Sequence, residues 1–127
     1  MKIDHVAIYV LDLEGARRFF ETYFGGTSND MYHNPRTGLK TYFISFADGG
    51  RIEIMSRSEI YRAEFNQFRQ GFIHLAFSVG SKEAVDSLTE KLASAGYEIL
   101  SGPRTTGDGY YESCVRAFED ILIEITE

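Results

Sequence analysis

The chain has 127 residues, 43% of them hydrophobic and 25% charged, which is typical of one globular domain with its own hydrophobic core. Its net charge of −6 and its lack of lysine or arginine runs disfavour a nucleic-acid partner, which needs positive charge against the phosphates. The opening MKIDH is unlike a signal peptide, and no apolar run reaches membrane-spanning length. Cys114 is the one cysteine, so no disulfide can form within the chain. We therefore expect a cytoplasmic protein that does not bind a membrane.

The first half of the chain begins with a strand-like run and continues into a helix-like one. Residues 3–10 (IDHVAIYV) predict a strand. Asp12 is a good N-cap, and Gly25 with Gly26 ends the helix that follows it. Apolar residues recur there at helical spacing, at Ala16, Phe19, Phe20, Tyr23 and Phe24. Further β-type runs are 29–38 (a strand edge leading into a loop), 40–46 and 51–55, the last two joined by the hairpin-turn sequence ADGG.

The second half repeats this order after a connecting segment. Residues 58–70 contain Ile60, Phe65 and Phe68 among many charges, which predicts a linker helix. Residues 73–79 (IHLAFSV) predict a strand, and Ser81 is the N-cap of a helix that stops at Gly96. The apolar face of this helix is formed by Val85, Leu88, Leu92 and Ala95. The strands expected after it are 97–101, 110–117 and 121–125.

The two halves are one module written twice. Aligning His5 with His74 also aligns Ala7 with Ala76 and, further along, Val10 with Val79, Glu14 with Glu83 and Glu21 with Glu90. The expected fold is therefore α+β, with tandem βαβββ modules whose helices cover one face of the sheets. We expect a single domain over 1–127, with the first module at 1–57, the linker helix at 58–70 and the second module at 71–127.

Each module places one histidine and one glutamate on the same face of its strands. Because side chains alternate along a strand, the neighbouring aliphatic residues point to the helices and these polar residues point the other way. His5 and Glu53 are the pair in the first module, and His74 and Glu124 are the pair in the second. A glutamate set between two isoleucines is costly unless it is exposed or paired.

The recurrence of these pairs predicts a mononuclear divalent-metal site. A single histidine or glutamate in a strand is most often an ordinary surface residue. Two solvent-exposed faces have no reason, however, to match in residue type and in spacing. Two neutral imidazoles and two carboxylates suit Zn²⁺, Ni²⁺, Co²⁺, Mn²⁺ or Fe²⁺. We therefore expect His5, Glu53, His74 and Glu124 to bind one such ion.

The chain resembles the vicinal oxygen chelate superfamily of glyoxalase I, bleomycin-resistance proteins and extradiol dioxygenases. The resemblance rests on IDHVAIYVLDLEGARRFFETYFG, on FIHLAFSVGSKEAVDSLTEKLASAGYEI and on the closing ILIEI. It implies curled sheets around a metal-containing cavity and, in the glyoxalase I-like branch, the ligand order His, Glu, His, Glu. It also implies a small-molecule substrate and Zn²⁺ or Ni²⁺ before the other ions. In this family two modules can pair within one chain or between two, and the short chain with exposed sheet edges favours a homodimer. One departure is residues 117–121, AFEDI, where the family usually has Asp-Pro-(Asp/Glu)-Gly-Asn.

This ligand set indicates a metal-dependent lyase or isomerase of the glyoxalase I type. A Lewis-acidic metal would polarise a carbonyl of a substrate such as a hemithioacetal and stabilise an enediolate. Glu53 and Glu124 are the candidates for catalytic proton transfer. The alternatives are a bleomycin-resistance-like binding protein, which would not need four ligands, and an extradiol-type dioxygenase. A fourth protein ligand argues against the dioxygenase, whose iron needs more open positions.

Other residues carry weaker predictions. Arg51 would share the face of Glu53, and aromatic residues could line a cavity, although packing is at least as good an explanation for each. Residues 104–110 (RTTGDGY) form either a lid or, slightly favoured, an ordinary hairpin loop. His33 is expected at the surface and Cys114 in the core. The aromatic residues considered are Tyr9, Phe72 and Tyr111.

Overall fold

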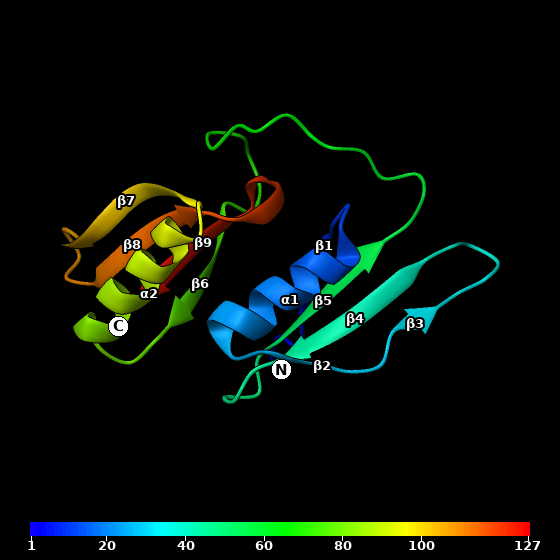
Figure 1. Ribbon diagram of the computed structural model, residues 1–127, viewed down its shortest axis with the longest axis horizontal. Helices are drawn as coiled ribbons and strands as arrows, with labels where there is room; N and C mark the ends of the chain where they lie inside the picture. Colours follow the sequence, from blue (N-terminus) through cyan, green and yellow to red (C-terminus); the bar gives the residue numbers. More distant parts are fainter. The chain divides into compact units, whose positions relative to one another are not determined.

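A computed structural model describes all residues of the chain, 1–127, and divides it into two compact units, Met1–Ala63 and Glu64–Glu127. Each unit has one main helix and one sheet, as Figure 1 shows. The elements of the first unit are β1 (Val6–Tyr9), α1 (Leu13–Phe24), β2 (Thr27–Ser28), β3 (Tyr32–His33), β4 (Lys40–Ser45) and β5 (Arg51–Ser56). Those of the second are β6 (His74–Ser78), α2 (Lys82–Ser94), β7 (Glu98–Thr105), β8 (Tyr111–Arg116), the 3₁₀ turn η1 (Phe118–Asp120) and β9 (Leu122–Thr126).

The two sheets have the same topology. In the first unit the strand order is β1-β5-β4-β2, with β3 also pairing with β4, and in the second it is β6-β9-β8-β7. In both, the first strand runs parallel to the last, and the remaining pairs are antiparallel. The α+β class and the tandem modules with mixed sheets are therefore confirmed.

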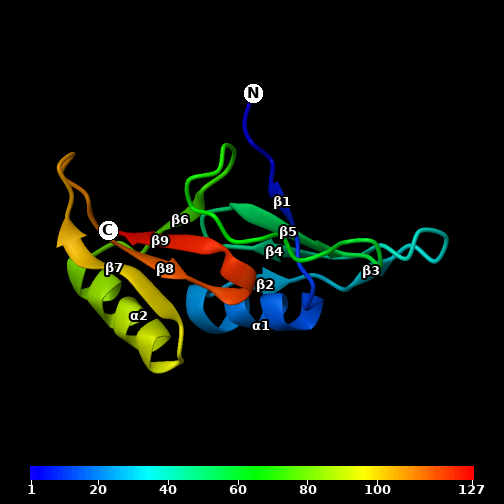
Figure 2. The same ribbon diagram turned by 90° about the horizontal axis from the view of Figure 1, so that it is seen from above.

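Helix α1 covers one face of the first sheet, as Figures 1 and 2 both show. The side chain of Asp12 caps its first turn by accepting a hydrogen bond from the backbone of Gly15, and Gly25 ends it in the left-handed conformation. Its buried residues pack against aliphatic side chains of the sheet, and Phe20 and Ile54 are fully buried. The predicted caps and apolar face of this helix are confirmed.

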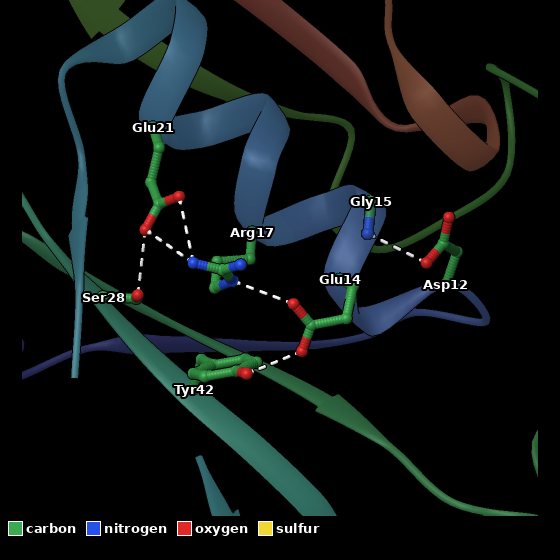
Figure 3. A network of polar contacts seen from close by, with 7 residues as sticks. All are labelled: Asp12, Glu14, Gly15, Arg17, Glu21, Ser28 and Tyr42. Carbon is green, nitrogen blue, oxygen red and sulfur yellow. Dashed lines mark hydrogen bonds and ion pairs between the residues drawn. The ribbon is translucent and has the colours of Figure 1, made fainter. Parts of the chain in front are cut away.

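A polar network ties the exposed side of α1 to the neighbouring strands (Figure 3). Glu14 accepts a hydrogen bond of 2.6 Å from the Tyr42 hydroxyl of β4 and forms an ion pair with Arg17. Arg17 also pairs with Glu21, whose carboxylate accepts a hydrogen bond of 2.9 Å from Ser28 of β2. The hydrogen bond from Tyr42 lowers the pKa of Glu14, and Arg17 adds to this effect.

Helix α2 covers the equivalent face of the second sheet. Ser81 caps it by accepting a hydrogen bond from the backbone of Ala84, as predicted. Inside this unit the Thr89 hydroxyl lies 2.6 Å from the Ser113 hydroxyl of β8 and donates to the carbonyl of Val85, so a buried polar pair is satisfied between helix and sheet. Ser113 lies opposite Ile125, which is fully buried, so the aliphatic residues of β9 face the helix.

The predicted linker helix at 58–70 is wrong, because no helix or strand occurs between β5 and β6. Phe65 and Phe68 are three positions apart, as on one face of a helix, but Phe68 is 88% exposed, so the spacing alone gives no packed apolar face. A short helix is stable in water only when it packs an apolar face against something else, and this segment has no such face. The chain also has no helix whose length and apolar character would let it span a membrane.

Two other elements differ from the sequence-based expectation. Strand β7 extends to Thr105, and residues 106–110 form a hairpin turn in which the backbone of Thr106 donates to the carbonyl of Tyr110. Of the two predictions for this segment, the hairpin loop is the one that the structure shows.

The turn before β9 also differs from the family's usual sequence. In it, Glu119 and Asp120 adopt positive φ values of 50° and 66° without glycine. Asp120 accepts a hydrogen bond of 2.9 Å from Arg116 there, and β9 pairs with β8 in regular register from Leu122 to Thr126.

Candidate metal-binding site

The first candidate pair, His5 and Glu53, lies on the face of the first sheet opposite to α1. Glu53 sits between Ile52 and Ile54 in β5, which are buried on the helix side, while its own side chain is 17% exposed on the other face. His5 directly precedes β1, which pairs in parallel with β5. The Nε2 atom of His5 lies 3.6 Å from Oε2 of Glu53. Residues 48 positions apart in sequence thus become neighbours because the first and last strands of the module are adjacent.

The second pair repeats this geometry in the other unit. Glu124 lies in β9 between the buried Ile123 and Ile125, with a side-chain exposure of 20%. His74 begins β6, which is parallel to β9. The Nε2 atom of His74 lies 3.6 Å from Oε2 of Glu124, the same separation as in the first unit. Each module therefore presents one imidazole and one carboxylate side by side.

The structure brings together the members of each pair and does not contain a larger cluster. Across the described residues 1–127, no group of three or more His, Cys, Asp or Glu side chains is arranged to hold a metal ion. The four-ligand site consequently stays a prediction, with two matched halves as its structural basis.

The residue opposite each glutamate differs between the halves. Phe43 of β4 pairs in register with Glu53, and its ring lies nearly perpendicular to the His5 ring with centroids 5.1 Å apart. Cys114 of β8 occupies the corresponding place opposite Glu124. Cys114 is a free thiol, only partly buried, so the expected core position is only partly realised.

Charged groups around the first pair hold the imidazole in place. The Nδ1 atom of His5 is 2.9 Å from Oδ2 of Asp4, and Arg51 forms an ion pair with the same carboxylate oxygen. These hydrogen bonds lower the pKa of Asp4. Arg51 also lies over the Phe43 ring, 5.0 Å from its centroid. Arg51 was expected on this face, whereas Asp4 was missed, although an acidic residue directly before a candidate histidine is a usable signal.

Around the second pair the charges are different. Glu112 of β8 lies on the same face as Cys114 and Glu124, and Arg104 of β7 is 3.9 Å from its carboxylate. Burial and the negative charge of Glu124 raise the pKa of Glu112. The thiol of Cys114 has a raised pKa for the same two reasons, burial first.

The aromatic residues considered as cavity lining do not gather at these pairs. Tyr111 donates a hydrogen bond of 2.7 Å to Asp86 of α2, so it belongs to the helix side of its sheet. Tyr9 and Phe72 are exposed, by 56% and 87%. His33 is exposed in β3, as expected.

Comparison with known proteins supports one family. Residues 2–125 match the sequence family described as the Glyoxalase/Bleomycin resistance protein/Dioxygenase superfamily. The chain is 32% identical over 124 residues to YqjT, an uncharacterized protein of Bacillus subtilis (strain 168), covering 95% of this chain and 94% of that protein.

Solved structures show the same fold. A glyoxylase/bleomycin resistance protein/dioxygenase domain from Frankia sp. EAN1pec superposes with a TM-score of 0.83 at 22% identity, covering 99% of this chain and 96% of that one. A possible glyoxalase from Bacillus cereus superposes with a TM-score of 0.74 at 26% identity, covering 100% and 99%. The resemblance seen in the sequence is confirmed by these matches.

Proposed function

Because the chain belongs to the glyoxalase/bleomycin resistance protein/dioxygenase superfamily, we propose that it is a metal-dependent lyase or isomerase of the glyoxalase I type. Its substrate would be a small molecule with two vicinal oxygen atoms, such as a hemithioacetal. The observation that carries the proposal is the identical His–Glu pair, with Nε2 and Oε2 3.6 Å apart, on the sheet face away from the helix in each module.

These four residues fit a divalent ion. Two ligand atoms that bind one ion at about 2.0–2.2 Å are separated by about 3–3.6 Å, so each pair already has a ligand-to-ligand distance close to that range. Two carboxylates balance the charge of a divalent cation, and two imidazole nitrogens suit Zn²⁺ or Ni²⁺, with Co²⁺, Mn²⁺ and Fe²⁺ as alternatives. We therefore assign His5, Glu53, His74 and Glu124 as the ligands.

The chain's own contribution to the reaction would be proton transfer. A bound divalent ion supplies Lewis acidity, which makes a carbon next to a substrate carbonyl more acidic. A carboxylate oxygen of Glu53 or Glu124 would accept the proton from that carbon and return it to the neighbouring one. Partial burial of both carboxylates limits competition from water.

The proposal is tested by metal analysis combined with a substrate panel. Protein loaded with Zn²⁺ or Ni²⁺ and then dialysed should retain about one ion for each complete set of four ligands. The variants His5→Ala and His74→Ala should each bind the ion more weakly. The loaded protein should turn over at least one member of a panel of aldehyde–thiol adducts and small epimerisable acids. If it turns over none of them and instead binds a bleomycin-like drug tightly, the binding-protein alternative replaces this proposal. Ring cleavage of a catechol by the Fe²⁺-loaded protein would favour the dioxygenase.

We further propose that the protein works as a homodimer with its metal sites at the interface. One module supplies only two ligands, so a complete site needs two modules, from one chain or from two. Light scattering of the purified protein should give twice the chain mass of 14.4 kDa. A stable monomer that still binds a full complement of metal would contradict the interface placement.

A further inference from the structure

The two ring nitrogens of His5 face two different carboxylates. Nδ1 is 2.9 Å from Oδ2 of Asp4, and Nε2 is 3.6 Å from Oε2 of Glu53. When Nδ1 carries the proton and donates it to Asp4, Nε2 keeps its lone pair on the side of Glu53. The aspartate thus selects the tautomer that a metal ligand needs.

Asp4 is itself held by a second contact. Arg51, two positions before Glu53 on the same face of β5, forms an ion pair with the Asp4 oxygen that faces His5. The guanidinium also lies over the Phe43 ring, and the Phe43 ring packs nearly perpendicular to the His5 ring. Asp4, His5, Phe43 and Arg51 therefore form a closed set of contacts that restricts the His5 ring.

We propose that Asp4 is a positioning residue for His5, orienting its Nε2 atom toward the metal, and that Arg51 holds Asp4 for this purpose. The inference rests on the proposed metal site. A carboxylate behind a metal-binding histidine fixes the ring and makes it a better ligand, and its loss typically weakens metal binding by about 10–100-fold.

The second module lacks these supporting residues. By the sheet register, Ile73 stands where Asp4 stands, Leu122 where Arg51 stands, and Cys114 where Phe43 stands. None of the three can accept a hydrogen bond from His74 as a carboxylate does. The two halves are therefore chemically unequal, and His5 is the histidine that is oriented before metal arrives.

The experiment compares Zn²⁺ affinity, measured by competition with a chromophoric chelator, in the full-length protein and three variants. Asp4→Ala should weaken binding about 10–100-fold. Asp4→Asn should lose less, because its amide oxygen can still accept from Nδ1–H. Asp30→Asn, which removes the same charge from an exposed position of the first unit, should bind as the wild type does.

Two further measurements separate positioning from a general structural role. The thermal unfolding midpoint of metal-free Asp4→Ala should match that of the wild type. In Zn²⁺-loaded protein, NMR should detect a slowly exchanging His5 Nδ1 proton that exchanges faster in Asp4→Ala. Weakened Zn²⁺ binding that is matched by a lower metal-free midpoint, with unchanged exchange, would overturn the positioning role.

Failure of this inference differs from failure of the metal site. If wild-type protein does not bind Zn²⁺, or if His5→Ala binds it as tightly as wild type, the metal site itself is refuted. If His5→Ala weakens binding and Asp4→Ala does not, the metal site stands and the role of Asp4 is refuted.

Discussion

Cys114 of β8 lies directly opposite Glu124 of β9, in the register position that Phe43 occupies opposite Glu53 in the other module. The two halves of the candidate site thus differ in the residue opposite the glutamate, as they do at the positions of Asp4 and Arg51. A bulky ring supports one pair, and a small thiol accompanies the other.

The thiol of Cys114 should react slowly with alkylating reagents at neutral pH. Burial and the nearby charges of Glu124 and Glu112 raise its pKa, so little thiolate is present. Glu124→Gln removes one of these charges and should increase the rate at which iodoacetamide modifies Cys114. Mass spectrometry of the metal-free protein measures this rate. Glu83→Gln, an exposed position on α2, is the charge-matched control and should leave the rate unchanged. Wild-type labelling as fast as that of a free cysteine peptide would contradict this reading.

The two site glutamates should separate ligand binding from proton transfer. Glutamine keeps the size of the side chain and an oxygen that can coordinate, but it does not accept a proton at neutral pH. If Glu124 is the base, Glu124→Gln should lower turnover of the active substrate about 10²–10⁴-fold while keeping much of the metal affinity. Glu53→Gln tests the other candidate in the same assay. Equal and small losses in both variants would exclude a carboxylate base.

The polar network that joins α1 to β4 and β2 should stabilise the protein at neutral pH and lose this effect in acid. Tyr42→Phe removes the hydrogen bond to Glu14 and should cost about 1 kcal/mol of unfolding free energy at neutral pH. The Glu14 pKa is lowered in the folded protein from its ordinary value of 4.5, so this contribution is present above that value and is lost as the pH falls through the folded pKa. Urea unfolding of wild type and variant between pH 3 and 7 should therefore show a difference that shrinks below about pH 4.5. A constant difference would show that Glu14 is not involved.

The core of the second unit should be intolerant of truncation. Ile123 is fully buried between the sheet and α2, so Ile123→Ala should lower the unfolding free energy by about 2–5 kcal/mol. Ile73→Ala makes the same chemical change at a position that is 56% exposed, and should cost less than about 0.5 kcal/mol. Chemical denaturation followed by circular dichroism measures both. Similar losses in the two variants would contradict the assigned burial.

Local features of the sequence determined most of the secondary structure and the face on which each candidate ligand lies. The caps at Asp12 and Ser81 and the helical spacing of apolar residues act within a few positions, so they can be read directly. Glu53 and Glu124 each lie between isoleucines in a strand of period two, which sends them to the face away from the helices. The prediction of a linker helix at 58–70 was wrong because a short helix needs packing, which the spacing of apolar residues alone does not supply.

Only the tertiary structure decided which residues meet. The parallel pairing of the first and last strands of each module places His5 beside Glu53 and His74 beside Glu124, and such long-range pairing is not encoded in local periodicity. The same pairing brings Arg51 to Asp4, which no sequence pattern connects. The recurrence in the sequence indicated a histidine and a glutamate in each half. The order of the strands in each sheet determined that Nε2 of each histidine lies 3.6 Å from its glutamate. The tertiary structure also determined that only His5 has a second carboxylate, that of Asp4, at its Nδ1 atom.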